Sequence, residues 1–232
     1  MIDAGLAKRD ILARLAAISE DGEKLDAILI THEHSDHVSG LVALARVLDV
    51  PIFITRLTAN SIPWGDFTPK LECFGAGTRF CVGDIEVNSF TVPHDAIDPV
   101  GFSFETQGLK VGLVTDLGYV THNVKSHLRG VDMLIIESNH DLETLRYGNY
   151  PWPVRQRIMG RLGHLSNDAT CEFIRNDLDA KTSTLILGHL SENNNHPITV
   201  RMQAEQALLG RGLFQPRLVV VEPKQQSEVF TY

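Results

Sequence analysis

The pattern of apolar and polar positions predicts that helices and strands alternate along the chain. Apolar residues recur at helical spacing near the start, at Leu6, Ile11, Leu12, Leu15 and Ile18. This spacing predicts an amphipathic helix over residues 6–18 that covers a sheet. The apolar run at residues 27–30 predicts a buried strand over residues 26–30. Residues 38–48 are predicted as a helix and residues 52–54 as a short strand.

The middle of the chain predicts antiparallel hairpins. Short strand-like runs separated by turn signals occupy residues 79–82, 85–92, 100–106 and 110–115. An irregular loop is expected at residues 60–70, where glycine and prolines gather. Later elements are predicted as helices at 121–128, 168–178 and 197–209 and as strands at 133–137, 184–187 and 217–221. The pattern therefore predicts an α/β protein, and its length of 232 residues fits a single domain over residues 1–232.

A cluster of histidine and acidic residues directly follows the first predicted strand, in the sequence Thr-His-Glu-His-Ser-Asp-His of residues 31–37. At strand alternation His32 and His34 point the same way, so both imidazoles can reach one cation. Asp36 and His37, where the chain turns, can serve a second cation. Neutral imidazole with carboxylate suits zinc, iron or manganese rather than calcium or magnesium. A polar turn of solvated histidines is the alternative.

Three later residues stand where predicted strands end. They are His94, Asp116 and His189. Because strand ends of one sheet converge on one rim, these residues are expected to complete a two-metal site. His164 precedes a predicted helix instead, which favours an acid or supporting role over ligation. His122, His127, His140 and His196 have no such context and are expected to be ordinary surface or core histidines.

Composition limits the class of protein. The net charge of −8 argues against a generally basic surface that coats nucleic acid, although a metal pair would make one cleft locally positive. Cys73, Cys81 and Cys171 are odd in number and lack CxxC spacing, so neither a disulfide framework nor a thiolate zinc site is expected. No secretory signal or bilayer span is visible, and a cytoplasmic protein without membrane partners is expected.

These motifs resemble those of the metallo-β-lactamase fold hydrolases, whose hallmark is an HxHxDH loop with a later His, Asp and His. The resemblance implies an αββα sandwich of mixed sheets with flanking helices. It also implies that a first metal is held by His32, His34, His94 and Asp116. A second metal would be held by Asp36, His37, Asp116 and His189.

Four longer phrases look like the YycJ/WalJ branch of that superfamily. They are VPHDAIDPVGF at 92–102, ESNHD at 137–141, GHLSN at 163–167 and GHLSENNN at 188–195. Members of this branch are regarded as cytoplasmic 5′-to-3′ DNA exonucleases related to ribonucleases Z and J. Family members carry strands before the phrase that resembles residues 2–5. The expectation is therefore either that the start of the chain was assigned too late or that the protein is a shortened version that lacks the first strands.

The resemblance implies phosphodiester hydrolysis by a hydroxide that bridges two zinc or manganese ions. Asp36 would orient the nucleophile, and His164 would protonate the leaving sugar oxygen, as a histidine in a similar phrase does in ribonuclease Z. DNA is the expected substrate, with RNA as the alternative. Arginines 155, 157 and 161 could contact the nucleic-acid backbone, although a solvated helix face is the favoured interpretation.

Ser191, Asn193 and Asn194 directly follow a predicted ligand and offer hydrogen-bond donors to a terminal phosphate, although a structural turn would explain them equally well. Other functions compete on the same scaffold: a ribonuclease, a cyclic phosphodiesterase, a glyoxalase II type thioesterase, a mononuclear iron dioxygenase and an inactive regulatory protein. Turnover of 5′-phosphorylated DNA against a thioester, and the metal content of each chain, would separate them.

Overall fold

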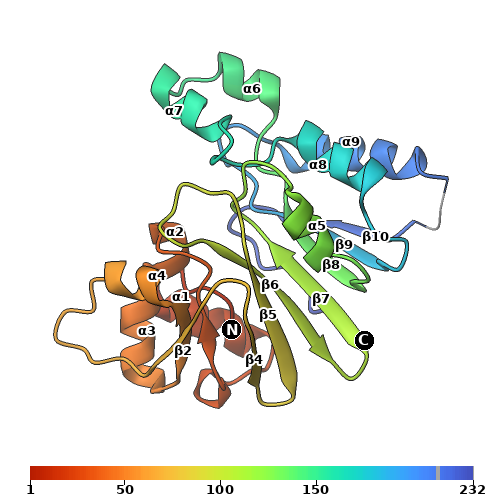
Figure 1. Ribbon diagram of the computed structural model, residues 1–232. Coiled ribbons are helices and arrows are strands. Elements are labelled where there is room, and N and C mark those ends of the chain that lie inside the picture. The colour runs from red at the N-terminus through yellow and green to blue at the C-terminus, as the bar shows by residue number, and fades with distance from the viewer. Residues whose placement is uncertain (213–214, 232) are drawn as a thin grey trace. The chain divides into compact units, whose positions relative to one another are not determined.

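The structure, a computed structural model, describes residues 1–212 and 215–231. The chain divides into two compact units (Figure 1). The first unit comprises Met1–Ser89 and Ala96–Val100, and the second comprises Phe90–Asp95 and Gly101–Tyr232. The single domain expected over residues 1–232 stays a prediction.

The first unit holds a parallel three-stranded sheet with the order β1-β2-β3, covered by helices. The strands are β1 (Ile28–Leu29), β2 (Ile52–Thr55) and β3 (Leu71–Phe74). The helices are α1 (Lys8–Ala17), a 3-10 turn (Gly22–Lys24), α2 (Ser35–Val38), α3 (Leu41–Leu48) and α4 (Arg56–Ser61). An antiparallel hairpin follows, formed by β4 (Arg79–Val82) and β5 (Ile85–Thr91).

In the first unit, the elements that the sequence predicted correctly are those that bury apolar side chains. One apolar cluster joins Ile11 of α1, Leu44 of α3 and Ile52 of β2, so the predicted helices and strands that supply it are confirmed. The strand β3 was not predicted, since only one of its four residues is even partly buried and its sequence shows no apolar alternation. The helix α4 was also missed, and its end falls at the start of the loop expected from residue 60.

The second unit is built on a mixed sheet with the strand order β10-β9-β8-β7-β6. Strands β6 and β7 are antiparallel, and β7 to β10 run parallel. The strands are β6 (Val100–Thr106), β7 (Leu109–Val114), β8 (Met133–Glu137), β9 (Thr184–Gly188) and β10 (Arg217–Val220). The helices are α5 (His122–His127), α6 (Leu142–Tyr147), α7 (Trp152–Ile158), α8 (Asn167–Asn176) and α9 (Pro197–Leu209).

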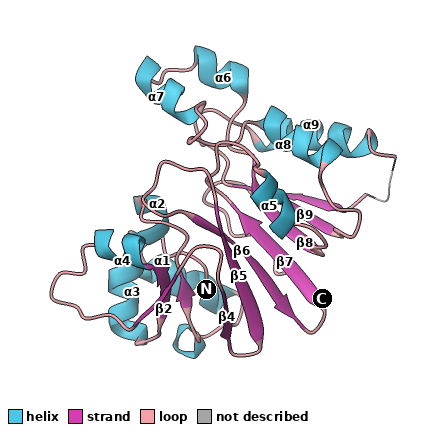
Figure 2. Cartoon of the chain, in the orientation of Figure 1, coloured by secondary structure: helices cyan, strands magenta, loops and turns pink. Residues whose placement is uncertain are grey.

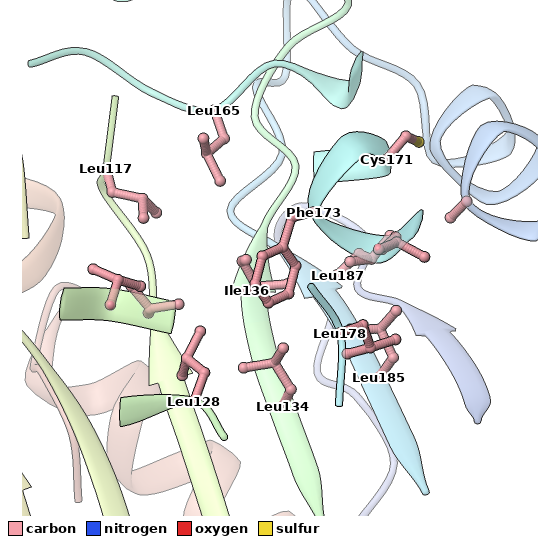
Figure 3. Packing of buried hydrophobic residues seen from close by; sticks show 14 of the residues in the cluster. Leu117, Leu128, Leu134, Ile136, Leu165, Cys171, Phe173, Leu178, Leu185 and Leu187 are labelled. Atoms are coloured by element: carbon pink, nitrogen blue, oxygen red, sulfur yellow. The ribbon is translucent and has the colours of Figure 1, made fainter. Parts of the chain in front are cut away.

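The core of the second unit lies between its sheet and the helices α5, α8 and α9. Figure 3 shows Phe173 reaching from α8 toward Ile136 of β8, with Leu185 and Leu187 of β9 nearby. Each of these four residues is at most 3% exposed. Burial of apolar surface from the sheet and the helix faces together therefore holds the strand ends in place.

Several sequence predictions for this unit are confirmed. The expected strands, the helices at 121–128, 168–178 and 197–209 and the antiparallel hairpins all form, and Ser166 caps α8 by accepting a hydrogen bond from the Ala169 amide. The helices α6 and α7 were missed because among their residues only Leu145 is buried, so no apolar periodicity marks them. Both units are thus sheets flanked by helices, as expected for the fold class (Figure 2).

Among the described residues, no helix combines the length and the apolar character that crossing a bilayer requires. The three cysteines Cys73, Cys81 and Cys171 carry free thiols.

Candidate metal centre

Residues 31–37, here called the histidine loop, follow β1 in the first unit and end within the short helix α2. The ring centroids of His32 and His34 lie 4.7 Å apart, and those of His32 and His37 lie 4.1 Å apart. His32 and His37 are buried, whereas Asp36 is exposed, with its Oδ2 3.6 Å from Nε2 of His37. Three imidazoles and one carboxylate are therefore gathered in one loop, as the spacing predicts.

Asp3 supports this loop and was not singled out from the sequence. Its carboxylate accepts hydrogen bonds from the Thr31 amide and the Thr31 hydroxyl, both at 2.8 Å, and from Nδ1 of His37 at 2.8 Å. A carboxylate on Nδ1 holds the ring orientation and leaves Nε2 as the coordinating atom. Asp3 has a φ of 53°, a left-handed conformation that costs free energy in a residue with a side chain. The carboxylate network compensates for that cost.

In the second unit, two predicted ligands sit directly after parallel strands in strained backbone. Asp116 follows β7 with a φ of 56°, and His189 follows β9 with a φ of 55°. Their side chains converge, because Nε2 of His189 lies 3.5 Å from Oδ1 of Asp116. Nε2 of His94, which follows β5, lies 3.9 Å from the same oxygen. The second unit thus brings together the three residues that the sequence placed at strand ends.

Asp116 is almost completely buried, with 2% of its surface exposed. His94 donates from Nδ1 to the Gly163 carbonyl at 3.1 Å, so its Nε2 is left on the side of Asp116. Burial lowers the pKa of His94 and outweighs the opposing charge of Asp116. A neutral imidazole and a buried carboxylate are the forms in which these groups bind divalent metals.

Glu137, the last residue of β8, connects the predicted ligands of this unit and was not identified as functional from the sequence. Its Oε2 accepts hydrogen bonds from Nδ1 of His164 and Nδ1 of His189, both at 3.1 Å. Its Oε1 accepts from the amides of Leu117 and Leu165 at 2.8 and 2.9 Å. Both oxygens are used, so Glu137 supports two histidines rather than serving as a ligand. A lone acid closing the buried strand Met-Leu-Ile-Ile-Glu was the available sequence signal.

The protonation states of this cluster follow from these contacts. Burial opposes ionisation of Glu137, but hydrogen bonds from His164 and His189 and their charges outweigh it and lower its pKa to about 2. Burial likewise opposes protonation of His164, but the hydrogen bond to Glu137 and the charges of Glu137 and Asp116 raise its pKa. An ionised Glu137 therefore faces imidazoles that donate from Nδ1.

Buried amides hold the loops around this cluster. Asn167 accepts from the Ser138 hydroxyl at 2.7 Å and exchanges hydrogen bonds of 2.9 Å with Asn195. Asn139 donates to the His189 carbonyl at 2.9 Å. Three sequence phrases that carry the resemblance therefore meet in one hydrogen-bond network, which gives their asparagines a structural role.

The residues expected to bind a terminal phosphate contact one another. The Asn194 amide donates to the Ser191 hydroxyl at 3.2 Å, and Asn194 is 2% exposed, as in a structural turn. Asn193 donates from its side chain to the Tyr150 hydroxyl at 2.9 Å. Phosphate binding by these residues stays a prediction.

The histidines that lack a motif context behave as ordinary side chains. His140 is 1% exposed, and burial lowers its pKa to about 4, so it is a neutral core histidine. His127 stacks on Phe90 with ring centroids 4.7 Å apart, and His196 caps α9.

The donor chemistry fits divalent metal ions. In the second unit, Asp116, His164 and His189 offer atoms that lie within 4.8 Å of one another, beside the supporting carboxylate of Glu137. The first unit adds the imidazoles and carboxylate of the histidine loop. Imidazole nitrogen with carboxylate oxygen is typical of zinc and manganese centres, and here Nδ1 of His37 and Nδ1 of His189 are each held by a supporting carboxylate.

Comparison of the sequence with known proteins shows which family the chain belongs to. The sequence matches the beta-lactamase superfamily domain over residues 1–190. It is 36% identical over 215 residues to exodeoxyribonuclease YycJ of Bacillus anthracis, covering 91% of this chain and 81% of that protein. It is 38% identical over 222 residues to exodeoxyribonuclease WalJ of Streptococcus pneumoniae, covering 92% and 82%.

A solved structure supports the fold. The metallo-beta-lactamase fold protein YhfI of Bacillus subtilis aligns with a TM-score of 0.71 at 15% identity, covering 95% of this chain and 83% of that one. The chain therefore belongs to the beta-lactamase superfamily, in the family of the exodeoxyribonucleases YycJ and WalJ.

Proposed function

We propose that this protein is a metal-dependent exodeoxyribonuclease that hydrolyses phosphodiester bonds of DNA from the 5′ end. The observation that carries the proposal is identity of 36–38% over more than nine tenths of the chain to proteins named exodeoxyribonuclease. The buried imidazole and carboxylate clusters support it, since hydrolysis of a phosphodiester requires neutralised charge and an activated water. A cytoplasmic location forms part of the proposal, because free cysteines suit a reducing compartment.

In this proposal, the protein would hold two divalent ions, zinc or manganese, on the ligands that the resemblance implies. His32, His34, His94 and Asp116 would hold one ion. Asp36, His37, Asp116 and His189 would hold the other. When bound, such ions lower the pKa of water and offset negative charge on phosphoryl oxygens.

The side chains supply the remaining chemistry. Asp36 is exposed beside His37 and orients the attacking water. His164 donates from Nδ1 to Glu137, so its Nε2 is the atom that can give a proton to the departing sugar oxygen. Glu137 holds the ring in this orientation and stabilises its protonated form.

A substrate panel tests the proposal. Purified protein loaded with zinc or manganese is offered 5′-phosphorylated DNA, RNA of the same sequence and a glutathione thioester. We expect release of nucleotides from the 5′ end of DNA, loss of this activity with a chelator, and no thioester turnover. Preferential hydrolysis of RNA or of the thioester would overturn the proposal.

An Asp116→Ala variant tests the shared ligand. We expect it to lose both a full complement of two metals per chain, measured by elemental analysis, and DNA cleavage. The matched control is His122→Ala, which changes a histidine outside the proposed centre and should leave both quantities unchanged. Full metal content in Asp116→Ala would contradict the ligand assignment.

A further inference from the structure

Residues 142–162, here called the arm, form a segment of the second unit that contributes little to its core. The arm contains α6 and α7, which Figure 2 shows lying together apart from the sheet of this unit. Leu145 is its one buried residue, and α7 buries none. Core packing therefore does not explain why the chain builds these two helices.

Large aromatic side chains are exposed on the arm and beside it. Tyr147 is 86% exposed and Trp152 is 54% exposed. Tyr119, in the loop after Asp116, is 38% exposed. Exposed aromatic rings gathered in one region of a surface mark an interaction site, because burying them on a partner is favourable.

The arm is basic on an acidic protein. Its residues include Arg146, Arg155, Arg157, Arg161 and the single acid Glu143, giving a net charge of +3, whereas the whole chain carries −8. Two of the arginines lie over aromatic rings: Arg155 over Trp152 at 5.4 Å and Arg161 over Tyr119 at 4.5 Å. Arginine beside an exposed ring is the combination that holds a phosphate backbone while a base stacks.

The arm is fixed to the loops that carry the candidate metal ligands. Tyr150 accepts a hydrogen bond from Asn193, four residues after His189. Arg157 forms an ion pair with Asp95, the neighbour of His94. The Ile158 carbonyl accepts from the His164 amide at 3.0 Å. A strand held by the arm would therefore lie next to the second unit's cluster of ligands.

We propose that the arm binds single-stranded DNA, with Tyr147 and Trp152 stacking on bases and Arg146 contacting phosphates. This inference rests on the proposed function and names its substrate class: DNA whose cleaved strand is single-stranded next to the site. Stacking requires a free base face, which a duplex keeps covered by neighbouring base pairs. The positive charge of the arm favours a polyanion over a neutral or basic protein partner.

The double variant Tyr147→Ala/Trp152→Ala tests the stacking. The probe is a fluorescein-labelled, phosphorothioate-linked oligothymidylate of 20 nucleotides, bound by the metal-loaded protein and followed by fluorescence anisotropy. We expect the Kd to rise at least about tenfold, since stacking on one ring typically contributes about 5- to 150-fold to binding. The matched control, Ile198→Ala/Met202→Ala on α9, removes two side chains that are 63% and 64% exposed and should change the Kd less than about twofold.

The salt dependence of binding gives a second readout. Arg146→Gln should reduce the slope of log Kd against log salt by about one phosphate contact. An unchanged Kd in the double variant, or an equal loss of affinity for a blunt duplex, would overturn the single-strand proposal. A dimer of the wild-type protein that the double variant abolishes in sedimentation would assign the arm to self-association instead.

Turnover separates this inference from the proposed function. Bis(4-nitrophenyl) phosphate reports phosphodiester hydrolysis without a polynucleotide strand for the arm to hold, so its hydrolysis should be equal in wild type and double variant while the KM for single-stranded DNA rises. If the arm binds DNA but no phosphodiester is hydrolysed, the proposed nuclease activity is refuted and the proposed DNA binding by the arm stands. If DNA is hydrolysed and the double variant has an unaltered KM, the proposed DNA binding by the arm is refuted and the nuclease activity stands.

Discussion

Replacing Glu137 with glutamine should destabilise the second unit, although Glu137 is not one of the proposed ligands. Glutamine has the same shape, and its carbonyl can still accept from the Leu117 and Leu165 amides. Its NH₂ group, however, would face Nδ1 of both His164 and His189, which now donate to Oε2. An oxygen that accepts two hydrogen bonds would be replaced by an NH₂ group, which cannot accept them. The N–H groups of the glutamine and of the two histidines would then face one another in a buried site.

The magnitude follows from the pKa of Glu137. Its ionised form is favoured enough to lower the pKa from 4.5 to about 2. Because one pKa unit corresponds to about 1.4 kcal/mol, the native interactions of the carboxylate stabilise the fold by about 3 kcal/mol. Two hydrogen bonds to a charged group, at about 1.5–3 kcal/mol each, lead to a similar figure. We therefore expect the free energy of unfolding to fall by about 3 kcal/mol at pH 7.

The pH dependence has a definite sign. A carboxyl whose pKa is lower in the folded state stabilises the protein fully above its unfolded pKa, and the stabilisation is lost as pH falls toward the folded pKa. The difference in free energy of unfolding between wild type and Glu137→Gln should thus be largest between about pH 5 and the usual histidine pKa of about 6.5. It should fall as pH rises through the raised pKa of His164, whose protonated form Glu137 stabilises. It should shrink between pH 4.5 and about 2.

Urea unfolding of chelator-treated protein, followed by circular dichroism, measures this difference without a contribution from bound metal. Glu172→Gln, an exposed glutamate on α8, is the matched control and should change the free energy of unfolding by less than about 0.5 kcal/mol. A loss below about 1 kcal/mol in Glu137→Gln at pH 7, or one that does not diminish in acid, would refute the reasoning.

Three further outcomes are expected. His164→Ala should retain its metals but cleave DNA about 10²- to 10⁴-fold more slowly, as when a general acid is lost, and wild-type turnover in a steady-state assay would remove its role. Asp3→Asn should weaken metal binding about 10- to 100-fold in a chelator competition, because Nδ1 of His37 loses its carboxylate, and unaltered affinity would show that Asp3 does not support the ligand. Phe173→Ala should lower the free energy of unfolding by about 3–5 kcal/mol in urea by opening a cavity against β8, whereas a loss below about 1 kcal/mol would mean that the core closes around it.

The sequence predicted the candidate ligands more fully than it predicted what supports them. His94, Asp116 and His189 could be singled out because each stands where an apolar run stops, and a strand end is a local property of the chain. The contacts among them depend on neighbouring strands, and the structure supplies these for Asp116 and His189 after β7 and β9. Glu137 could not be assigned, because its partners are 27 and 52 residues away in the chain.

The sequence by itself determined the order of the main helices and strands, the types of metal-binding group and the family, because apolar periodicity and short motifs are written in neighbouring residues. Only the tertiary structure decided that Asp3 and Glu137 orient histidines, and that the basic aromatic arm adjoins His94 and His164. The physical reason is that a hydrogen bond or ion pair between distant residues depends on where packing brings them, and no local pattern encodes that distance.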